Sequence, residues 1–306
     1  MPRTVSAHIV LPLFSLLGRI AGGPRYRGLG RLAEFLSRFV APAIVEIQFE
    51  DRTTVTLDIL DYYWVRLIFD DYCYESEVDT VMRSLSIDDF IWLDCGANIG
   101  YWSLRMAGRT APSRVVAIEA SPPTFEKLQQ NVQRSGAAIC TINRALSDTA
   151  GSSLSFVVME RHAAAHLLDP AGTETLPPSA RVVEVETTTI DQIVSELDPG
   201  LSKLPIVIKL DVEGAELAAL RGASRTFDTR QVAIVYECHG NDPDCRVTAQ
   251  MLRDGRFDIF SLEGRFRRIT NVQEAQRIKV DRSKGYNFLA LDPSLLRHLS
   301  SGGDLR

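Results

Sequence analysis

The stretch Phe90-Ile-Trp-Leu-Asp94-Cys-Gly96-Ala-Asn98-Ile-Gly100 decides the fold of this chain. It begins with an apolar run and ends in a glycine-rich segment, and a helical pattern follows from Tyr101. An apolar run, a tight turn and a 3.6-residue period predict a strand, a turn and a helix, the first unit of an open, doubly wound α/β sheet. Backbone amides and the helix dipole at the start of such a helix favour a bound small molecule at this turn.

Two residues in the turn argue against a dinucleotide. The fingerprint G-x-G-x-x-G, started at Gly96, requires glycine at positions 98 and 101 so that a pyrophosphate can approach. Asn98 and Tyr101 stand there instead. Asp94, at the strand end, would repel pyrophosphate but suits the ammonium group of an amino acid. We therefore expect a zwitterion that carries a nucleoside, as S-adenosylmethionine does; the alternative is an acidic strand end followed by an ordinary glycine turn.

A second acidic strand end lies downstream. Residues 114–118 predict another buried strand, which ends at Glu119, nineteen residues after Gly100. Folds of this type place at this point the acid that accepts hydrogen bonds from the ribose hydroxyls. Taken alone, Glu119 would more often be a helix cap or a loop residue. Together with the first turn, cofactor binding becomes the better interpretation.

A buried strand with a lysine is expected at residues 206–210. Strand periodicity sends Lys209 and Asp211 to the same face. A buried lysine requires a nearby carboxylate, and the candidates are Asp211, Glu213 and Glu237. Asp211 could instead cap the helix that follows. We predict that these residues form a polar wall of an active site.

Three further residues give weaker signals. Glu75 precedes a helix expected at residues 78–85, so it is either a first-turn acid or a residue that folds over the cofactor cleft. Ser147 and Asp148 follow a strand expected at residues 139–143, at the same edge of the sheet. A carboxylate there could accept a hydrogen bond from an adenine amino group, although Asp148 also fits an ordinary turn.

Composition limits the class of protein. With 306 residues, of which 45% are hydrophobic, the chain can form one large α/β domain with an N-terminal addition. A net charge of −5 argues against a nucleic-acid partner. The apolar stretch 5–17 is too short to span a membrane and makes a weak signal peptide, so this arm would pack on the domain or touch a membrane surface. Five widely spaced cysteines suit reduced thiols in a cytoplasmic protein.

Two patterns could in principle hold a metal ion. One is Cys-His-x5-Cys from Cys238, and the other is the pair His162 and His166. Neither has a second pair of ligands or an acidic partner in register, so we predict no metal site. The histidine pair lies in residues 161–180, a long segment between two expected strands that could act as a substrate lid.

The chain divides into four parts by these patterns. We expect a helical or partly disordered arm (1–45), a β-hairpin and a lead-in helix (46–88), a cofactor-binding domain (89–293) and a C-terminal tail (294–306). Further elements expected are hairpin strands at 44–49 and 53–59, helices at 122–135 and 246–254, strands at 152–159, 181–189, 231–236, 257–262 and 286–291, and an irregular basic segment at 265–284.

Together these motifs resemble the FkbM-type methyltransferases, a branch of the class I S-adenosylmethionine-dependent enzymes. The similarity covers about residues 57–292, and its most specific element is the Lys-x-Asp-x-Glu-Gly-x-Glu run that starts at Lys209. The matching residues are the runs 74–77, 94–100, 144–148, 208–216 and 236–237, with Glu119.

The resemblance implies a mostly parallel, seven-stranded sheet with an antiparallel last strand. It also implies bound S-adenosylmethionine and O-methylation of a hydroxyl on a sugar, glycan or natural-product acceptor. Carried over by position, the implied contacts are Gly96, Asn98 and Gly100 at the methionine end, Glu119 at the ribose, and Ser147 or Asp148 at the adenine.

A hydroxyl acceptor must lose its proton, which a carboxylate or histidine within reach can take. We predict Asp211 as the first candidate base, with Glu237 and His239 next and Lys209 holding the acids in place. Two other functions compete: a nicotinamide-dependent oxidoreductase on a similar sheet, and a non-catalytic protein that keeps the donor site as a scaffold. No motif predicts the oligomeric state.

Overall fold

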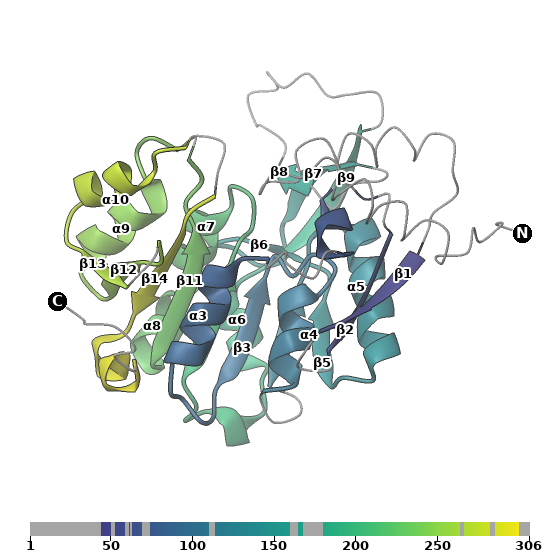
Figure 1. Ribbon diagram of the computed structural model, residues 1–306, viewed down its shortest axis with the longest axis horizontal. Helices are drawn as coiled ribbons and strands as arrows, with labels where there is room; N and C mark the ends of the chain where they lie inside the picture. The colour runs from purple at the N-terminus through teal and green to yellow at the C-terminus, as the bar shows by residue number, and fades with distance from the viewer. Residues whose placement is uncertain are drawn as a thin grey trace, which may run out of the picture.

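The computed structural model describes residues 44–49, 53–58, 61, 63–68, 74–109, 114–159, 165–167, 180–240, 242–263, 266–281 and 285–299. Residues 1–43 of the expected N-terminal arm and most of the segment 161–180, including His162, lie outside the described residues, whereas residues 44 and 45 of that arm begin a strand. The centre of the fold is a large sheet (Figure 1). In spatial order the strands are β13 (Arg267–Ile269), β12 (Asp258–Ser261), β14 (Asn287–Leu291), β11 (Val232–Glu237), β10 (Ile206–Leu210), β3 (Ile91–Cys95), β4 (Val115–Ile118) and β5 (Ile139–Ile142).

The direction of these strands matches the predicted doubly wound fold. Strands β5, β4, β3, β10 and β11 are parallel, whereas β14 runs antiparallel to both of its neighbours. The mostly parallel sheet with an antiparallel last strand is therefore confirmed. The described sheet has eight strands rather than seven, because β13 adds a short edge strand. β13 and helix α10 (Val272–Ile278) lie in the segment expected to be irregular. β13 reads Arg-Arg-Ile and lacks the apolar alternation that marks a strand.

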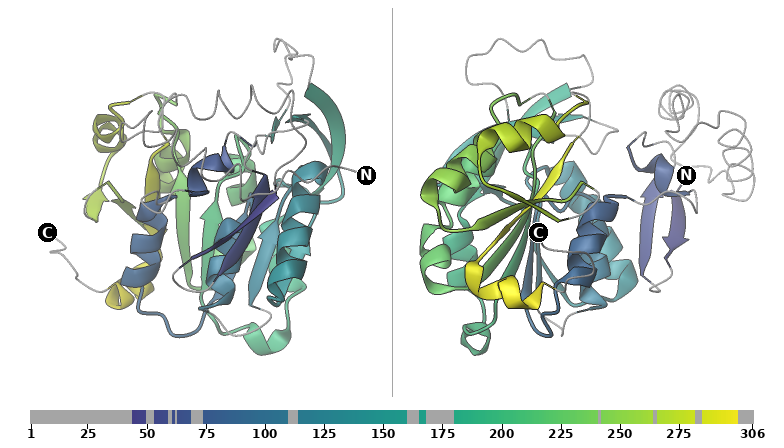
Figure 2. Two further views of the ribbon diagram at one scale, coloured as in Figure 1. Left: turned by 45° about the vertical axis from the view of Figure 1, so that its right-hand side comes forward. Right: turned by 60° about the vertical axis from the view of Figure 1, so that its left-hand side comes forward.

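Alternate residues of the central strands face two separate cores. Trp92 and Val207 lie in one core, and Leu93 and Ile208 lie in the other. The two views of Figure 2 show helices on both faces of the sheet. Burial on both faces explains why these strands are continuous apolar runs. The first face carries α3 (Ser76–Ser84), α4 (Tyr101–Ala107) and α5 (Pro122–Ser135), and the second carries α6 (Ile190–Ser195), α7 (Glu216–Arg221), α8 (Ser224–Thr229), α9 (Arg246–Asp254) and α10.

Local signals set the bounds of several elements as expected. α5 begins at Pro122, which suits the first helical turn, and stops before Gly136, whose φ of 67° is left-handed. The predicted hairpin is present as β1 (Ile44–Gln48) and β2 (Thr54–Asp58). Asn131 of α5 holds the hairpin to the glycine turn, because its side chain accepts the Thr56 N–H at 3.0 Å and donates to the Ile99 carbonyl at 2.8 Å.

A second, smaller sheet lies at the carboxyl end of the large one (Figure 1). Its strand order is β6 (Ala145–Leu146), β9 (Ala180–Thr188), β7 (Ser153–Met159) and β8 (Ala165–Leu167). β7 and β9 were predicted, but β8, which includes His166, lies in the segment expected to be a loose lid. The remaining described elements are the 3-10 helices η1 (Trp64–Ile68), η2 (Pro199–Leu201) and η3 (Pro293–His298).

The segments at either end of the expected cofactor domain share its core. Val55 of the hairpin, Val78 of α3 and Leu295 of η3 lie in the same apolar cluster as Trp92 of the central strand. Among the described residues, no helix has the length and apolar character needed to cross a bilayer.

Candidate functional site

The turn after β3 has a left-handed backbone that brings two loops together. Gly96, Asn98 and Gly100 have φ values of 85°, 53° and 91°. A Cβ atom on Gly96 would lie 1.7 Å from the backbone oxygen of Asp211, and one on Gly100 would lie 2.6 Å from a methyl carbon of Leu128. Only glycine at position 96 lets this turn touch the backbone that follows β10.

Glu119 connects this turn to the end of β4. One of its carboxylate oxygens accepts the N–H of Asn98 at 2.9 Å, and the other accepts the N–H of Ser121 at 2.8 Å. Each carboxylate oxygen can accept a further hydrogen bond. The side chain is 8% exposed, and burial raises the pKa of Glu119 to about 7. The predicted cofactor acid thus lies beside the predicted turn.

Lys209 is buried among carboxylates. Its Nζ donates to Asp211 at 2.9 Å and lies 3.6 Å from Glu75, and Asp94 is its register partner on β3. Burial alone would lower the pKa of Lys209, but Asp211, Glu75 and Asp94 together raise it well above its usual value. The expected pairing with Asp211 is confirmed. The second carboxylate, Glu75, was not among the expected partners.

Asp94 lies inside β3 rather than at its end. It is 1% exposed, and its carboxylate accepts a hydrogen bond from the Ser103 hydroxyl at 2.6 Å. Burial raises the pKa of Asp94, while Lys209 opposes that shift. Asp94 nevertheless lines the same cleft as Gly96.

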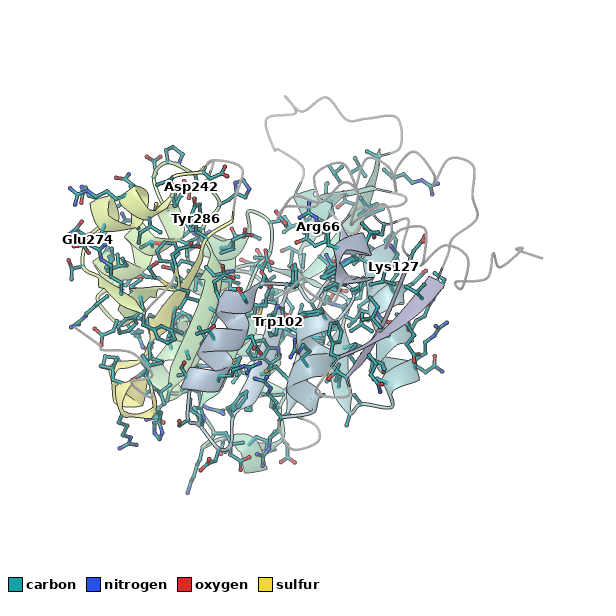
Figure 3. The ribbon with its side chains drawn as sticks, viewed as in Figure 1. Arg66, Trp102, Lys127, Asp242, Glu274 and Tyr286 are labelled. Carbon is teal, nitrogen blue, oxygen red and sulfur yellow. The ribbon has the colours of Figure 1, made fainter. Side chains whose placement is uncertain are left out.

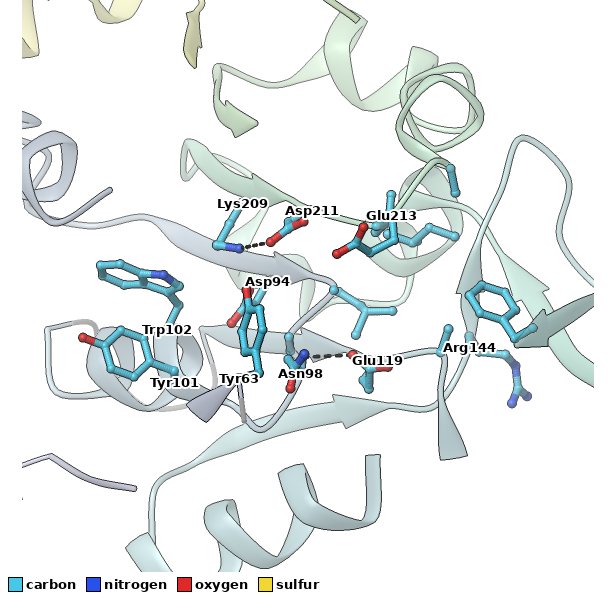
Figure 4. A pocket seen from close by; sticks show the side chains of 18 of the residues that line it. Tyr63, Asp94, Asn98, Tyr101, Trp102, Glu119, Arg144, Lys209, Asp211 and Glu213 are labelled. Atoms are coloured by element: carbon cyan, nitrogen blue, oxygen red, sulfur yellow. Dashed lines mark hydrogen bonds and ion pairs between the residues drawn. The ribbon is translucent and has the colours of Figure 1, made fainter. Parts of the chain in front are cut away.

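These groups line one cleft at the carboxyl edge of the large sheet. In Figure 4, Tyr101 and Trp102 lie at one end, Arg144 lies at the other, and Glu119 lies between them. The polar and turn residues that line the cleft are Asp94, Gly96, Asn98, Glu119, Arg144, Lys209, Asp211 and Glu213. Its aromatic and apolar residues include Tyr63, Trp64, Tyr74, Tyr101, Trp102, Ile118, Leu146, Phe156 and Val212.

An aromatic wall of Tyr63, Trp64, Tyr74, Tyr101 and Trp102 closes one end of this cleft. The hydroxyls of Tyr63 and Tyr74 lie 3.1 Å apart, and Trp64 donates from its indole nitrogen to the Asn98 side chain at 3.1 Å. The sequence reasoning missed this wall. The available signal was the run of three aromatic residues at 62–64 and the pair at 101–102.

The structure does not bring Ser147 and Asp148 to the cleft. The Ser147 N–H donates to Thr188 in the small sheet, and the Asp148 carboxylate accepts from Arg221 at 3.0 Å on the surface. Neither residue lines the cleft. At the Arg144 end of the cleft, the lining residues are Arg144, Leu146 and Phe156. The expected contact of Asp148 with adenine is therefore not supported by its position.

Glu237 and His239 line a neighbouring pocket, which shares only Asp211 and Glu213 with the cleft. The Glu237 carboxylate packs against Gly285, where an added Cβ would lie 1.4 Å from it. Burial, and then the charge of Asp211, raise the pKa of Glu237 to about 8. His239 is exposed. Both predicted residues therefore lie next to Asp211 but outside the cleft.

Two residues predicted to bind the cofactor lie behind the cleft wall. Gly100 packs on Leu128 and does not line the cleft. Glu75 also does not line it, because its side chain lies behind Lys209 and Trp102 and contacts both. Glu75 therefore contacts two residues of the cleft wall but does not fold over the cleft itself.

The residues present fit a cationic amino acid joined to a nucleoside. The buried carboxylates of Asp94 and Glu119 both line the cleft, and Gly96 lies between them in the sequence. At position 96 itself, the Asp211 backbone leaves no room for a side chain. Carboxylates suit an ammonium group and ribose hydroxyls, whereas a pyrophosphate would need cationic or amide donors there. Of the described residues that line the cleft, Lys209 and Arg144 are cationic, and they are paired with Asp211 and Glu186.

The thiols of the Cys-His-x5-Cys pattern lie near Lys279. Cys238 and Cys245 are free thiols, and the Cys238 sulfur lies 3.2 Å from Lys279 Nζ. Within the described part of the chain, no group of three or more histidine, cysteine or acidic side chains is arranged to hold a metal ion.

Comparison with known proteins identifies a family. The sequence profile described as the Methyltransferase FkbM domain matches residues 94–259. Methyltransferase sdnD of Sordaria araneosa is 27% identical over 67% of this chain and 88% of its own length. Hexuronic acid methyltransferase AglP of Haloferax volcanii is 29% identical over 51% of this chain and 59% of its own. Methyltransferase 1 of Beauveria bassiana is 30% identical over 51% of this chain and 64% of its own.

Among solved structures, precorrin-6y C5,15-methyltransferase from Geobacter metallireducens GS-15 aligns with 71% of this chain and 88% of that chain, at 11% identity and a TM-score of 0.40. The family profile spans more than half of the present sequence and includes the glycine turn, Glu119 and the Lys209–Asp211 pair. The chain therefore belongs to the FkbM methyltransferase family and is a methyltransferase.

Proposed function

We propose that this methyltransferase takes its methyl group from S-adenosylmethionine and transfers it to a hydroxyl of a sugar, glycan or natural-product alcohol. The observation that carries the proposal is the position of the buried Lys209–Asp211 pair, which opens onto the same cleft as the Gly96 turn. A donor site and a candidate base are thereby adjacent.

The part of the cleft lined by Asp94, Glu119, Leu146 and Phe156 fits a nucleoside joined to an amino acid. We assign Asp94 to the ammonium group and Glu119 to the ribose hydroxyls, since both carboxylates are buried and face the cleft. Leu146 and Phe156 offer an apolar surface for the adenine ring. When bound, S-adenosylmethionine supplies a methyl group on a positively charged sulfur, so the donor needs no further activation.

The aromatic wall supports a ring-shaped, hydroxyl-bearing acceptor. Aromatic faces pack well against the C–H faces of sugars, and tyrosine hydroxyls can bond sugar hydroxyls. Tyr63 is 41% exposed, so the wall is accessible from solvent. The Haloferax volcanii relative, whose name assigns it to hexuronic acid, agrees with a sugar acceptor, although it matches only about half of this chain.

Asp211 is the proposed base. A carboxylate within hydrogen-bond reach of the acceptor hydroxyl can take its proton as the methyl group is transferred. The Lys209 ammonium, 2.9 Å away, fixes the orientation of this carboxylate. Glu237 and His239 stay second candidates, because they border Asp211 from the neighbouring pocket.

The test is a transfer assay with S-adenosylmethionine labelled in its methyl group. The acceptors are a uronic acid glycan, a neutral hexose glycan, a macrolide alcohol and an amine. The proposal expects label on a hydroxyl compound, and loss of at least about 100-fold in turnover in Asp211→Asn, the range for removing a catalytic base. Label on the amine alone would contradict O-methylation.

Binding measurements decide between the competing functions. Calorimetry should show that the protein binds S-adenosylmethionine and does not bind NADH. Binding of NADH without binding of S-adenosylmethionine would favour the oxidoreductase. A non-catalytic scaffold predicts that Lys209→Met and Asp211→Asn leave the protein's cellular role intact, whereas an enzyme predicts loss of that role.

A further inference from the structure

Glu75 has a backbone conformation that its residue type disfavours. It occupies the N-cap position of α3 with φ 45° and ψ 55°, in the left-handed region, and its side chain makes no capping hydrogen bond. An N-cap residue normally adopts an extended backbone and bonds the first turn of its helix with its side chain. Strain of this kind persists where surrounding contacts require it, and it is often found at functional sites.

The Glu75 side chain instead reaches two other elements. Its carboxylate accepts the indole N–H of Trp102 in α4 at 2.5 Å and lies 3.6 Å from Lys209 Nζ in β10. Its side chain is 14% exposed, and Trp102 lies beside α3 (Figure 3). Trp102 and Lys209 both line the cleft, whereas Glu75 does not.

One ammonium group therefore faces several acids. Lys209 Nζ is 0.7 Å closer to Asp211 than to Glu75, by 2.9 against 3.6 Å. The indole donor of Trp102 satisfies the same Glu75 oxygen that faces Lys209. If Glu75 lost that donor, it would compete more strongly with Asp211 for the ammonium group.

We propose that Glu75 is a positioning residue, which holds Lys209 and Trp102 from behind the cleft wall so that the Lys209 ammonium is presented to Asp211. The proposal rests on the proposed role of the Lys209–Asp211 pair. It also explains the left-handed backbone, because that conformation turns the side chain away from its own helix and toward the cleft wall.

Burial raises the pKa of Glu75 to about 6, and Lys209 opposes that shift. The charged groups that act on it are Lys209 of β10, Asp211 just after β10 and Asp94 of β3, and the Trp102 indole donates a hydrogen bond to it. The charge of Glu75 in turn acts on the hydroxyls of Tyr63 and Tyr74. A proton gained by Glu75 below pH 6 should therefore be sensed by the Trp102 indole and by the reaction rate.

The first test needs no acceptor. Tryptophan fluorescence of the purified protein is titrated from pH 5 to 8 in wild type, Glu75→Gln and Trp102→Phe. The proposal expects a step near pH 6 that both variants lack. A step that survives in Glu75→Gln would overturn it.

The second test separates positioning from binding. Glu75→Gln keeps the shape and an oxygen acceptor for Trp102 but removes the charge. We expect kcat to fall about 10-fold, as for a misplaced reacting group, with the dissociation constant of S-adenosylmethionine changed less than about twofold. Glu126→Gln, an exposed acid on α5, is the matched control and should leave both unchanged. Loss confined to S-adenosylmethionine affinity would overturn the proposal and return Glu75 to cofactor binding.

The third test uses the strained, left-handed backbone at residue 75. Glu75→Gly and Glu75→Ala both remove the carboxylate, and only alanine keeps a Cβ atom on the backbone at φ 45°, so the Tm of Glu75→Gly should exceed that of Glu75→Ala while kcat falls in both as in Glu75→Gln. Wild-type kcat in both variants would overturn the proposal. Failure of the proposed function is distinguishable, because in that case wild type itself would not bind S-adenosylmethionine.

Discussion

Single residues at this site owe their chemistry to burial. Burial raises the pKa of Glu75 to about 6, that of Glu119 to about 7 and that of Glu237 to about 8. Each carboxyl group is therefore partly protonated near neutral pH, unlike an exposed glutamate. Because only the ionised form of Glu119 accepts hydrogen bonds with all its oxygen lone pairs, its state should control binding of the donor.

At the residue scale, the affinity for S-adenosylmethionine should increase as pH rises from 6 to 8, because Glu119 ionises near pH 7. Glu119→Gln should weaken binding by about 10- to 100-fold at pH 8, corresponding to one charge-assisted hydrogen bond. It should also flatten the pH dependence. Calorimetry at three pH values measures both effects. Equal affinity of the two proteins at pH 8 would remove Glu119 from the donor site.

A matched pair of glycines tests the contact of the two loops. Gly96 and Gly136 both have positive φ, but an added Cβ meets the Asp211 backbone at position 96 and nothing within 4 Å at position 136. Gly136→Ala should cost about 1 kcal/mol of unfolding free energy, for backbone strain alone. Gly96→Ala should cost at least about 3 kcal/mol, since backbone must move. Urea unfolding measures the free energy of unfolding of both variants. Equal losses of unfolding free energy would contradict the close contact between Gly96 and the Asp211 backbone.

Elements determine which side chains reach the cleft. Leu146 lies in β6, which pairs with β9 in the small sheet, and this pairing sends the chain away from the cleft at Ser147. The Asp148 carboxylate then meets Arg221, at the end of α7. The expectation for Asp148 came from its place after a strand, and the tertiary pairing of that segment reversed it.

At the element scale, Ser147→Ala and Asp148→Asn should leave the affinity for S-adenosylmethionine within about twofold, and loss of the solvent-exposed ion pair with Arg221 should change stability little. Phe156→Leu, in β7, removes an aromatic face that lines the cleft and should weaken the affinity measurably. Titration of the three variants makes the comparison. A tenfold loss in Asp148→Asn would restore the adenine contact.

The whole molecule places its polar site where two apolar cores and two sheets meet. The large sheet is apolar on both faces, and its parallel strands deliver Asp94, Glu119 and Asp211 to one edge. Open α/β sheets bind ligands at that edge because no strand continues beyond it. The small sheet and the aromatic wall complete the cleft there.

At the scale of the whole molecule, the free energy of unfolding should decrease as pH rises from 5.5 to 8.5. The acids Glu75, Glu119 and Glu237 have folded pKa values above the unfolded value of 4.5, so in this range the folded chain binds more protons than the unfolded one. Stability then decreases with pH. Urea unfolding at both pH values measures the difference, which Glu237→Gln should reduce. An increase in stability across this range would show that these carboxyl groups are ionised in the folded protein.

Local patterns in the sequence were sufficient for most of the fold. Apolar runs and glycine stops gave the bounds of α5, α9 and β10, and the alternation at residues 44–58 gave the hairpin, because these signals act between near neighbours. The cost of an unpaired buried charge predicted that Lys209 pairs with a carboxylate, with Asp211, Glu213 and Glu237 as candidates, and the structure shows Asp211. The strands β8 and β13 were not predicted, because a strand of three residues is too short to show a hydrophobic alternation.

By itself the sequence determined the individual strands of the central sheet, the glycine turn and the acids at the ends of the strands, because each depends on residues within a few positions of one another. Only the tertiary structure decided that Glu75 meets Lys209, that Asp148 meets Arg221 and that five aromatic side chains form one wall. Those contacts join residues far apart in the chain. Their geometry is set by how helices and sheets pack, and no local period in the sequence records it.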